Sequence, residues 1–440
     1  MSGIFYNNFN LLLNFAANKI KMEDIFISHI HINEVRHLKN IDIPLSDAHR
    51  QHLILTGKNG SGKTSLLEQL RLQYEQGIQN KGFQRIPTLK TDILSFEAHI
   101  QELNASFLMK NEAEAMKIKS QIESIENSID NLNKQLKNFE QLDVTLKNVL
   151  NVSEEYEKGD FVLAYFDAKR TVSMKKPIGV NKVQLKDTYS ITEKPSADFI
   201  QYIVNLKADR SFARDDNDVS TIKEVDNWFV QFENSLKQIF DEKNLKLRFD
   251  RKNYNFDIVL NGRSFDFMTL SDGYSSVLNI VIEIMMRMEN KNARNYNIQG
   301  IVFIDEIETH LHIDLQKKIL PFLITFFPKI QFIVTTHSPF VLTSIDNAVV
   351  FDLEKQLKLE NLSGYSSEAI VESYFQSDKY SELLKAQVAR YKELLNKANP
   401  TLEQEDEIES LRRYFRQLPK FLAPELQLTI NQLELAHLNA

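Results

Sequence analysis

One short segment of the sequence has the residue types and spacing of a phosphate-binding loop. Gly57–Thr64 reads GKNGSGKT, which fits glycine, four residues, glycine, lysine and then serine or threonine. Glycines let successive backbone N–H groups converge on phosphate oxygens, and a helix that starts near Lys63 directs its positive dipole end at the same anion. We expect Lys63 to reach the β- and γ-phosphates of ATP and Thr64 to coordinate Mg²⁺ through its hydroxyl. The residues expected to bind the nucleotide in this loop are Gly57, Asn59, Gly60, Ser61, Gly62, Lys63, Thr64 and Ser65.

A second segment supplies the carboxylates that such a loop requires. The apolar run Ile301–Ile304 ends in Asp305 and Glu306. We expect Asp305 to hold Mg²⁺ directly or through water, and Glu306 to polarise the attacking water as the catalytic base. Taken alone, an apolar run followed by two acids fits a strand end with a solvated pair equally well. The phosphate loop is what favours the catalytic interpretation.

Two further motifs carry groups that can meet a phosphate. Leu270–Ser276 (LSDGYSS) precedes an apolar helix, so that the Ser271 hydroxyl and the Gly273 N–H lie at a helix N-terminus. His337, in TTHSPF, follows an apolar strand and is a candidate catalytic group that hydrogen-bonds a γ-phosphate oxygen or the bound water. Each motif also has a plain structural explanation, a helix cap for the first and a structural histidine for the second.

The elements that must position these motifs alternate between strands and helices. The isoleucine spacing of residues 24–43 predicts strands, and a strand, the phosphate loop and a helix after Ser65 follow in order. Residues 245–260 read as a hairpin that is followed by the turn dipeptide Asn261-Gly262. Alternating strands and helices predict a parallel sheet, and the remaining segments expected in it or beside it are 161–166, 275–288, 301–304 and 332–335.

Long helices are predicted at two places. Between Thr88 and Lys158 the sequence has no glycine or proline, which favours helix. From Tyr365 onward only helical patterns are evident, and Tyr380–Lys397 and Glu403–Leu418 stand out. A seven-residue repeat predicts a coiled-coil insertion, with an ordinary amphipathic helix as the alternative; its apolar positions are Ile118, Ile122, Ile125, Ile129, Leu132, Leu136 and Phe139.

In this order, the four motifs resemble those of the ABC-type ATPases of the SMC and RecF group, which includes the overcoming-lysogenisation-defect ATPases. The resemblance covers roughly residues 24–75 and 160–350. Its parts are an opening strand pair at 33–45, a Walker A motif at Gly57–Thr64, a signature at Leu270–Ser276, a Walker B motif at Ile301–Glu306 and a switch histidine at His337.

The resemblance implies a dimer in which two heads sandwich two ATP molecules. Ser271 and Gly273 of one subunit would then contact the γ-phosphate held by Lys63 of the other, in a homodimer or a higher homo-oligomer. The sequence departs from the family in two respects: Asp272 stands where transporters have glycine, and no Q-loop glutamine follows strand 161–166. Lys169 or Arg170 is a candidate to contact phosphate or DNA there instead.

With its short coiled coil and its C-terminal helices, the chain most resembles the stand-alone ATPases of anti-phage systems, of the Septu (PtuA) or PARIS (AriA) type. That resemblance implies a separate effector protein, a nuclease or toxin, for which the C-terminal helices are a candidate docking surface. The alternative is a RecF- or SMC-like ATPase of DNA repair or chromosomes that binds DNA directly. Basic residues within 168–186 are a candidate DNA path, although the residues themselves favour the alternative of a solvated loop edge.

The predicted fold class is α/β: a P-loop NTPase with an ABC/SMC-like head, a helical coiled-coil insertion and a C-terminal helical region. The expected divisions are an N-terminal extension (1–21), the Walker A lobe (22–92), the insertion (93–158), the lobe with signature, Walker B and switch histidine (159–360), and the C-terminal helices (361–440).

Composition limits the other classes of function. The 440 residues include 53 lysines and arginines against 60 acids, a formal charge of −7, so that any contact with DNA has to be local. There is no cysteine, which excludes disulfides and thiolate chemistry and fits a reducing compartment. Neither a signal peptide nor an apolar run of membrane-spanning length is evident. We therefore expect a cytoplasmic protein without membrane contact.

Overall fold

The computed structural model describes residues 24–107, 112–170, 174–290, 296–359, 362–371, 382–397, 400–417 and 424–438. The chain forms two compact units, Met1–Tyr365 and Ser366–Ala440, called here the head and the tail. The predicted N-terminal extension, residues 1–21, lies outside the described residues. Within the described segments, every helix is too short or too polar to cross a membrane.

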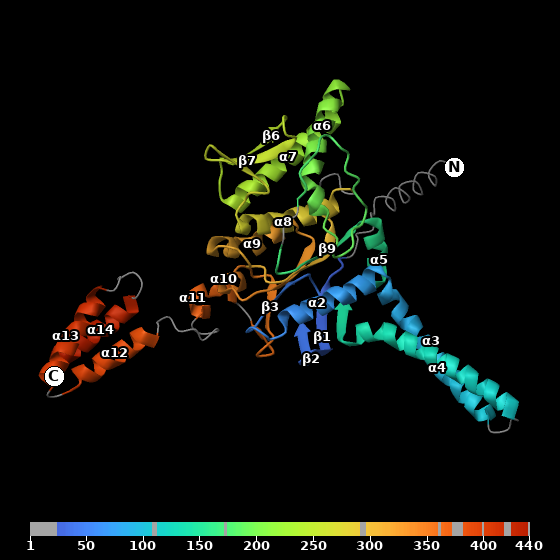
Figure 1. Cartoon of the computed structure of the whole chain (residues 1–440), viewed down its shortest axis with the longest axis horizontal. Coiled ribbons are helices and arrows are strands. Elements are labelled where there is room, and N and C mark those ends of the chain that lie inside the picture. Colours follow the sequence, from blue (N-terminus) through green and yellow to red (C-terminus); the bar gives the residue numbers. More distant parts are fainter. Residues whose placement is uncertain are drawn as a thin grey trace, which may run out of the picture. The chain divides into compact units, whose positions relative to one another are not determined.

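A six-stranded sheet forms the centre of the head (Figure 1). Its order is β12 (Leu357–Leu359), β11 (Ala348–Asp352), β3 (His52–Thr56), β10 (Ile330–Thr335), β9 (Gln299–Ile304) and β5 (Phe161–Phe166). All neighbours are parallel except β11 and β12. Every residue of β3, β9 and β10 is buried, as is typical of a parallel sheet covered on both faces. The predicted parallel sheet is confirmed.

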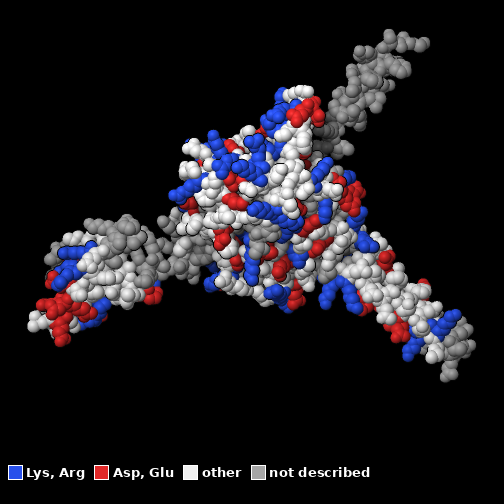
Figure 2. Space-filling view, turned by 45° about the horizontal axis from the view of Figure 1, so that its top comes forward, with Lys and Arg blue, Asp and Glu red and all other residues white. Residues whose placement is uncertain are grey.

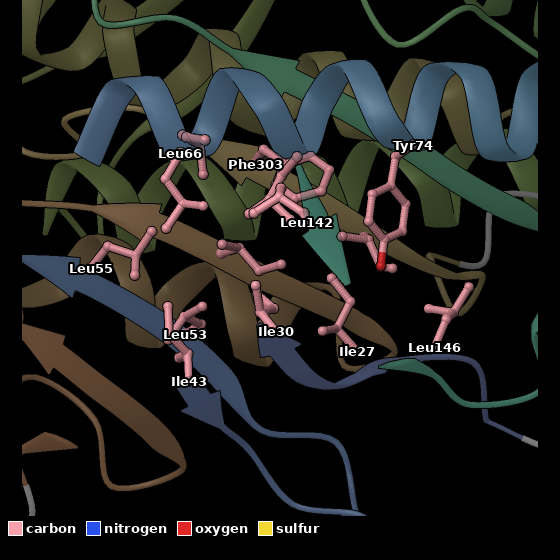
Figure 3. Close-up of a cluster of buried hydrophobic side chains, with 14 of the residues drawn as sticks. Ile27, Ile30, Ile43, Leu53, Leu55, Leu66, Tyr74, Leu142, Leu146 and Phe303 are labelled. Carbon is pink, nitrogen blue, oxygen red and sulfur yellow. The ribbon is translucent and has the colours of Figure 1, made fainter. Parts of the chain in front are cut away.

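Helix α2 (Lys63–Tyr74) joins this sheet to a smaller antiparallel one. The second sheet has the order β2 (Leu38–Pro44), β1 (Ile27–Val35) and β4 (Leu142–Leu146). Figure 3 shows Leu66 and Tyr74 of α2 directed at side chains from both sheets. Because these residues share one buried cluster, the start of α2 is fixed relative to β3, and with it the loop between them.

Helices α3 (Gly82–Phe107) and α4 (Glu112–Glu140) pack along each other and project from the head (Figure 1). A π-helical turn, η1 (Glu75–Gln79), connects them to α2. The helical pair begins earlier than residue 93 and ends at 140. The helical insertion expected over 93–158 is interrupted by β4, whose alternating Leu142, Val144 and Leu146 pair with β1. Helix α5 (Val149–Lys158) follows β4 and packs against β5.

The second half of the head adds a lobe and the helices around the sheet. A short turn, η2 (Pro195–Asp198), precedes α6 (Phe199–Asp215) and α7 (Val219–Phe240), which lead to the antiparallel sheet β6 (Lys246–Asp250), β7 (Asn255–Leu260) and β8 (Arg263–Asp266). The predicted hairpin is confirmed, and Asn261 and Gly262 have φ of 49° and 77°, as a type I′ turn requires. The remaining helices are α8 (Asp272–Met288), α9 (Ile313–Phe326) and α10 (Pro339–Leu342). The head ends with η3 (Leu362–Gly364).

The tail begins with a short helix, α11 (Ser367–Ala369), and is built on three longer ones, α12 (Glu382–Leu395), α13 (Leu402–Gln417) and α14 (Pro424–Leu438). They share a core of their own, in which Tyr391 and Phe415 stack edge to face at 5.3 Å. The tail therefore has its own buried contacts, as an independently folding unit needs.

Candidate functional site

The phosphate loop lies where β3 ends and α2 begins. Its glycines are required by the backbone: Gly57, Gly60 and Gly62 have φ of 131°, 84° and 96°, a region that other residues rarely adopt. A Cβ on Gly62 would also lie 2.8 Å from a methyl carbon of Leu38. The sequence therefore needs glycine at these positions for conformation and, at Gly62, for space.

Lys63 closes the loop on itself. Its Nζ donates to the carbonyl oxygens of Gly57 at 2.9 Å and Lys58 at 3.1 Å. An ammonium group has three donors, so one remains for a ligand. Burial lowers the pKa of Lys63, against the raising effect of Glu306 and Glu308. The acids beside the loop thus oppose the loss of the lysine charge.

The loop has polar groups that suit a phosphate. The Ser61 hydroxyl is buried and has no hydrogen-bond partner among the described residues. Gly62 caps α2 without a side-chain hydrogen bond, which leaves the first N–H groups of the helix available to an anion. Thr64 and Asn59 are exposed at the mouth of the loop, and Ser65 is half-buried. These donors fit a polyphosphate.

The Mg²⁺ ligands predicted from sequence meet in the fold. Thr64 Oγ1 donates to Asp305 Oδ1 at 3.2 Å although 241 residues separate them. Asp305 is almost fully buried at the end of β9, and its Oδ1 also accepts from Thr335 Oγ1 at 2.6 Å. A hydroxyl and a carboxylate beside a phosphate loop are oxygen donors of the kind that Mg²⁺ prefers. The residues present therefore fit the metal.

Glu306 has a strained backbone that its neighbours hold in place. Its φ is 43°, a conformation that costs a non-glycine residue of the order of 1–3 kcal/mol. Its N–H donates to Thr335 Oγ1 at 2.7 Å, its carbonyl accepts from Arg170, and its carboxylate accepts from Thr309 Oγ1 at 3.2 Å. Strain of this kind concentrates at functional sites, where it fixes the direction of a side chain.

His337 is half-buried after β10, close enough to Lys63 for their charges to interact. Burial, and then the charge of Lys63, lower the pKa of His337, so that the imidazole is neutral at neutral pH. Its backbone N–H donates to Glu308 Oε1 at 2.6 Å, and Thr336 Oγ1 donates to Glu308 Oε2 at 2.7 Å. Glu308 therefore positions the turn that carries His337.

The signature residues lie on a separate element. Ser271 is exposed and precedes α8, and Gly273 is buried in its first turn. Among the described residues, no hydrogen bond connects Ser271 or Gly273 to the phosphate loop of the same chain. A Cβ on Gly273 would lie 2.8 Å from the carbonyl oxygen of His310, so this glycine is required for packing against the turn after Glu306.

Three residues of the site were not predicted as such: Thr335, Glu308 and Arg170. Thr335 and Glu308 lie within or beside predicted motifs. A hydroxyl and a carboxylate so close to the strand ends could have been predicted as site residues from the sequence. For Arg170 the sequence was misleading, because a basic stretch suggests an exposed side chain and this one is buried. Of the two candidates to contact phosphate or DNA, Arg170 is 9% exposed and donates to backbone carbonyls of the Walker B turn, which contradicts that role for Arg170. The other candidate, Lys169, is exposed and stays a prediction.

The rest of the basic stretch is partly neutralised. Lys175 pairs with Asp198 at 2.8 Å and Lys186 with Glu193. Over the face of the head in Figure 2, lysine and arginine side chains are interspersed with acidic ones. This distribution differs from the continuous basic stripe typical of a duplex-binding surface.

Comparison with known proteins identifies the family. Residues 53–343 match the model of a family described as "AAA domain, putative AbiEii toxin, Type IV TA system". The chain belongs to this family of AAA-domain ATPases. The match includes all four motifs, from the phosphate loop to His337.

The curated relatives include Septu and retron proteins and a DNA replication and repair protein, RecF of Rickettsia typhi (strain ATCC VR-144 / Wilmington), which is 30% identical over 113 residues, 21% of this chain and 31% of that protein. The chain is 38% identical over 153 residues to the Septu protein PtuA of Bacillus mycoides (strain KBAB4), which is 32% of this chain and 21% of that protein. It is 35% identical over 153 residues to the Retron Ec83 probable ATPase of Escherichia coli, 32% of this chain and 28% of that one. The chain therefore matches less than a third of the length of each of these relatives. The predicted similarity to Septu-type ATPases is confirmed.

Solved structures include an SMC head bound to the C-terminal winged-helix domain of ScpA. It is 10% identical, with a TM-score of 0.37, over 77% of this chain and 99% of that one. A likeness at this level adds no argument about function.

Proposed function

We propose that this protein binds and hydrolyses ATP with Mg²⁺ as an ABC-type ATPase, and that hydrolysis requires two heads. The observation that carries the proposal is the joint placement of Lys63, Thr64, Asp305 and Glu306 at one sheet edge, with Ser271 on an element apart from them. The contacts expected from Ser271 and Gly273 are thus not made to the phosphate loop of the same chain among the described residues. A second head supplies them in the proposed dimer.

Each residue has a role that its geometry supports. Lys63 and the loop N–H groups bind the β- and γ-phosphates, and Thr64 and Asp305 hold Mg²⁺. When bound, Mg²⁺ neutralises charge that develops on the phosphate oxygens. Glu306, fixed by its backbone bonds, orients water and accepts its proton. His337, neutral because of burial and Lys63, accepts or donates one hydrogen bond at the γ-phosphate or that water.

The biological role that we propose is control of a separate effector protein, a nuclease or toxin, in bacterial anti-phage defence. The names of the Septu and retron relatives support the defence context, and the tail, with a core of its own, is a candidate docking surface for the partner. The alternative is a repair or chromosome ATPase that binds DNA directly. The ion pairs of Lys175 and Lys186 weigh against the proposed DNA path.

The mass of the natively purified complex separates the two roles. Glu306→Gln removes the base, keeps the shape of the side chain and should trap the ATP-bound dimer. The variant is co-expressed with the neighbouring gene, and native mass is measured with and without ATP. A second polypeptide in fixed ratio supports effector control. A nucleotide-dependent homodimer that retains DNA, sensitive to charge reversal of Lys175 and Lys176, supports the repair role instead.

Complementation tests whether the site is shared between heads. Lys63→Ala should abolish ATP binding, and Ser271→Arg should bind ATP yet not hydrolyse it. In a mixed dimer, Lys63 of the second variant faces Ser271 of the first, so one intact site forms. With random pairing in a two-fold dimer, an equimolar mixture should recover about a quarter of wild-type turnover. No recovery in mixtures shown to form mixed dimers would contradict the shared site.

A further inference from the structure

Arg170 is a buried cation that joins two motifs of the site. One of its terminal nitrogens donates to Ser276 Oγ at 2.8 Å and to the Ile307 carbonyl at 3.2 Å. The other donates to the carbonyls of Asp305 at 2.8 Å and Glu306 at 2.5 Å. Ser276 belongs to α8, the signature helix, and the three carbonyls belong to the Walker B turn. One guanidinium therefore spans both.

The contact with Glu306 fixes a residue whose backbone is strained. Thr335 Oγ1 accepts the Glu306 N–H, and Arg170 binds the Glu306 carbonyl from the other side. The Glu306 carbonyl also accepts the Thr309 N–H at 2.9 Å, and the Thr309 hydroxyl donates to the carboxylate, so that the left-handed backbone at φ 43° and these bonds together direct the carboxylate. Arg170 therefore acts on the orientation of the Glu306 carboxylate through the backbone of that residue, and among the described residues it makes no hydrogen bond to the carboxylate itself.

Another cation cannot replace this one. A guanidinium presents a rigid planar fork of donors, whereas an ammonium group has three donors around one point. The acceptors of Arg170 are four, and they lie on two different elements. Burial lowers the pKa of Arg170 to about 10, which still leaves it protonated at neutral pH.

We propose that Arg170 is a positioning residue, which holds Glu306 in its catalytic orientation and couples it to the signature helix. The inference rests on the proposed role of Glu306 as base. Ser276 lies five residues beyond Ser271, and Gly273, between them, packs against the His310 carbonyl. Helix α8 thus meets the turn after β9 at two points, and a shift of its first turn on contact with the second head moves the segment that carries Glu306.

The test compares steady-state ATP hydrolysis of Arg170→Lys and Arg170→Gln with the wild type. Displacement of the base by about 1 Å should lower kcat by roughly 10²-fold, while KM for ATP stays within about twofold because the phosphate loop is intact. The matched control is Arg287→Lys. Arg287 is as buried and donates to the carbonyls of Leu163 and Ser190, but it does not touch the Walker B turn. It should lose stability and keep its kcat per folded molecule.

Two further variants separate positioning from general damage. Ser276→Ala removes only the link to α8, and its kcat should fall less than that of Arg170→Lys. In Arg170→Ala, added guanidinium should restore turnover saturably, which a folding defect common to the whole population would not show. Wild-type kcat in Arg170→Lys, or an equal loss in Arg287→Lys, would overturn the proposal.

The proposed function can fail separately. If Glu306→Gln turns over ATP normally, Glu306 is not the base, whatever the Arg170 variants do. If Glu306→Gln is inactive and Arg170→Lys is normal, the base assignment stands and only the positioning role is lost.

Discussion

The hydroxyl of Thr335 hydrogen-bonds both members of the acidic pair, Asp305 and Glu306. It donates to Asp305 Oδ1 at 2.6 Å and accepts from the Glu306 N–H at 2.7 Å, and the residue is fully buried. Thr335→Val keeps the shape and removes both bonds. We expect this single substitution to destabilise the head and to slow ATP hydrolysis.

The magnitude follows from the two bonds. A hydrogen bond to a charged group contributes about 1.5–3 kcal/mol, and a buried N–H left without a partner costs about 1–3 kcal/mol. Together the loss is roughly 2.5–6 kcal/mol. Thr335→Ser is the matched control, because it keeps the hydroxyl and removes one methyl, at a cost of about 1 kcal/mol.

The fluorescence of Trp228 makes the measurement specific to the head. It is the only tryptophan in the chain and is 1% exposed, so urea unfolding followed by its emission reports the head and not the tail. The valine variant should reach its unfolding midpoint at a much lower urea concentration than the serine variant, with the same dependence of the unfolding free energy on urea. A difference under about 1 kcal/mol between them would refute the argument that this hydroxyl holds the site. Turnover of the valine variant should fall by about 10²-fold as Glu306 loses one anchor.

Two further predictions concern the two units. Burial lowers the pKa of His52 to about 4, and its Nδ1 accepts from the Phe332 N–H, a bond that protonation destroys. Between pH 6.5 and 4 the unfolded chain therefore binds a proton that the folded chain does not, and stability should fall by about 3 kcal/mol as pH falls; His52→Gln should lack this part of the slope in urea titrations. In the tail, Phe415→Ala should cost about 3–5 kcal/mol and lower its helical circular dichroism on heating. The Trp228 transition should be unchanged, and a shift of both would show that head and tail do not unfold independently.

The sequence predicted those parts of the site whose signal is local. The spacing from Gly57 to Thr64 encodes the loop, and the apolar runs before Asp305 and His337 place both at the carboxyl ends of buried strands. In the structure β10 lies between β3 and β9, which brings the three ends together. A local pattern was enough here because parallel strands expose their carboxyl ends at one edge.

The residues that were missed depend on partners far along the chain. Arg170 lies in a basic stretch, and the carbonyls that bury it, those of Asp305, Glu306 and Ile307, are more than 130 residues away in the sequence. Strand β4 is five residues between two helices, and only its pairing with β1 makes it a strand. The local sequence around Arg170 and β4 therefore predicts neither the carbonyls that Arg170 binds nor the edge of β1 that β4 pairs with.

Contacts within one chain fix the groups of the site in the head. Lys63 fastens the phosphate loop through Gly57 and Lys58, Thr335 holds the acidic pair, and Arg170 holds the backbone of Glu306. A site whose groups are all fixed in this way would hydrolyse ATP continuously unless one component were withheld. In the proposed mechanism that component is Ser271 of a second head. Control of turnover then lies in whether two heads meet, and a partner protein could regulate the enzyme by acting on the dimer, without contact to the nucleotide.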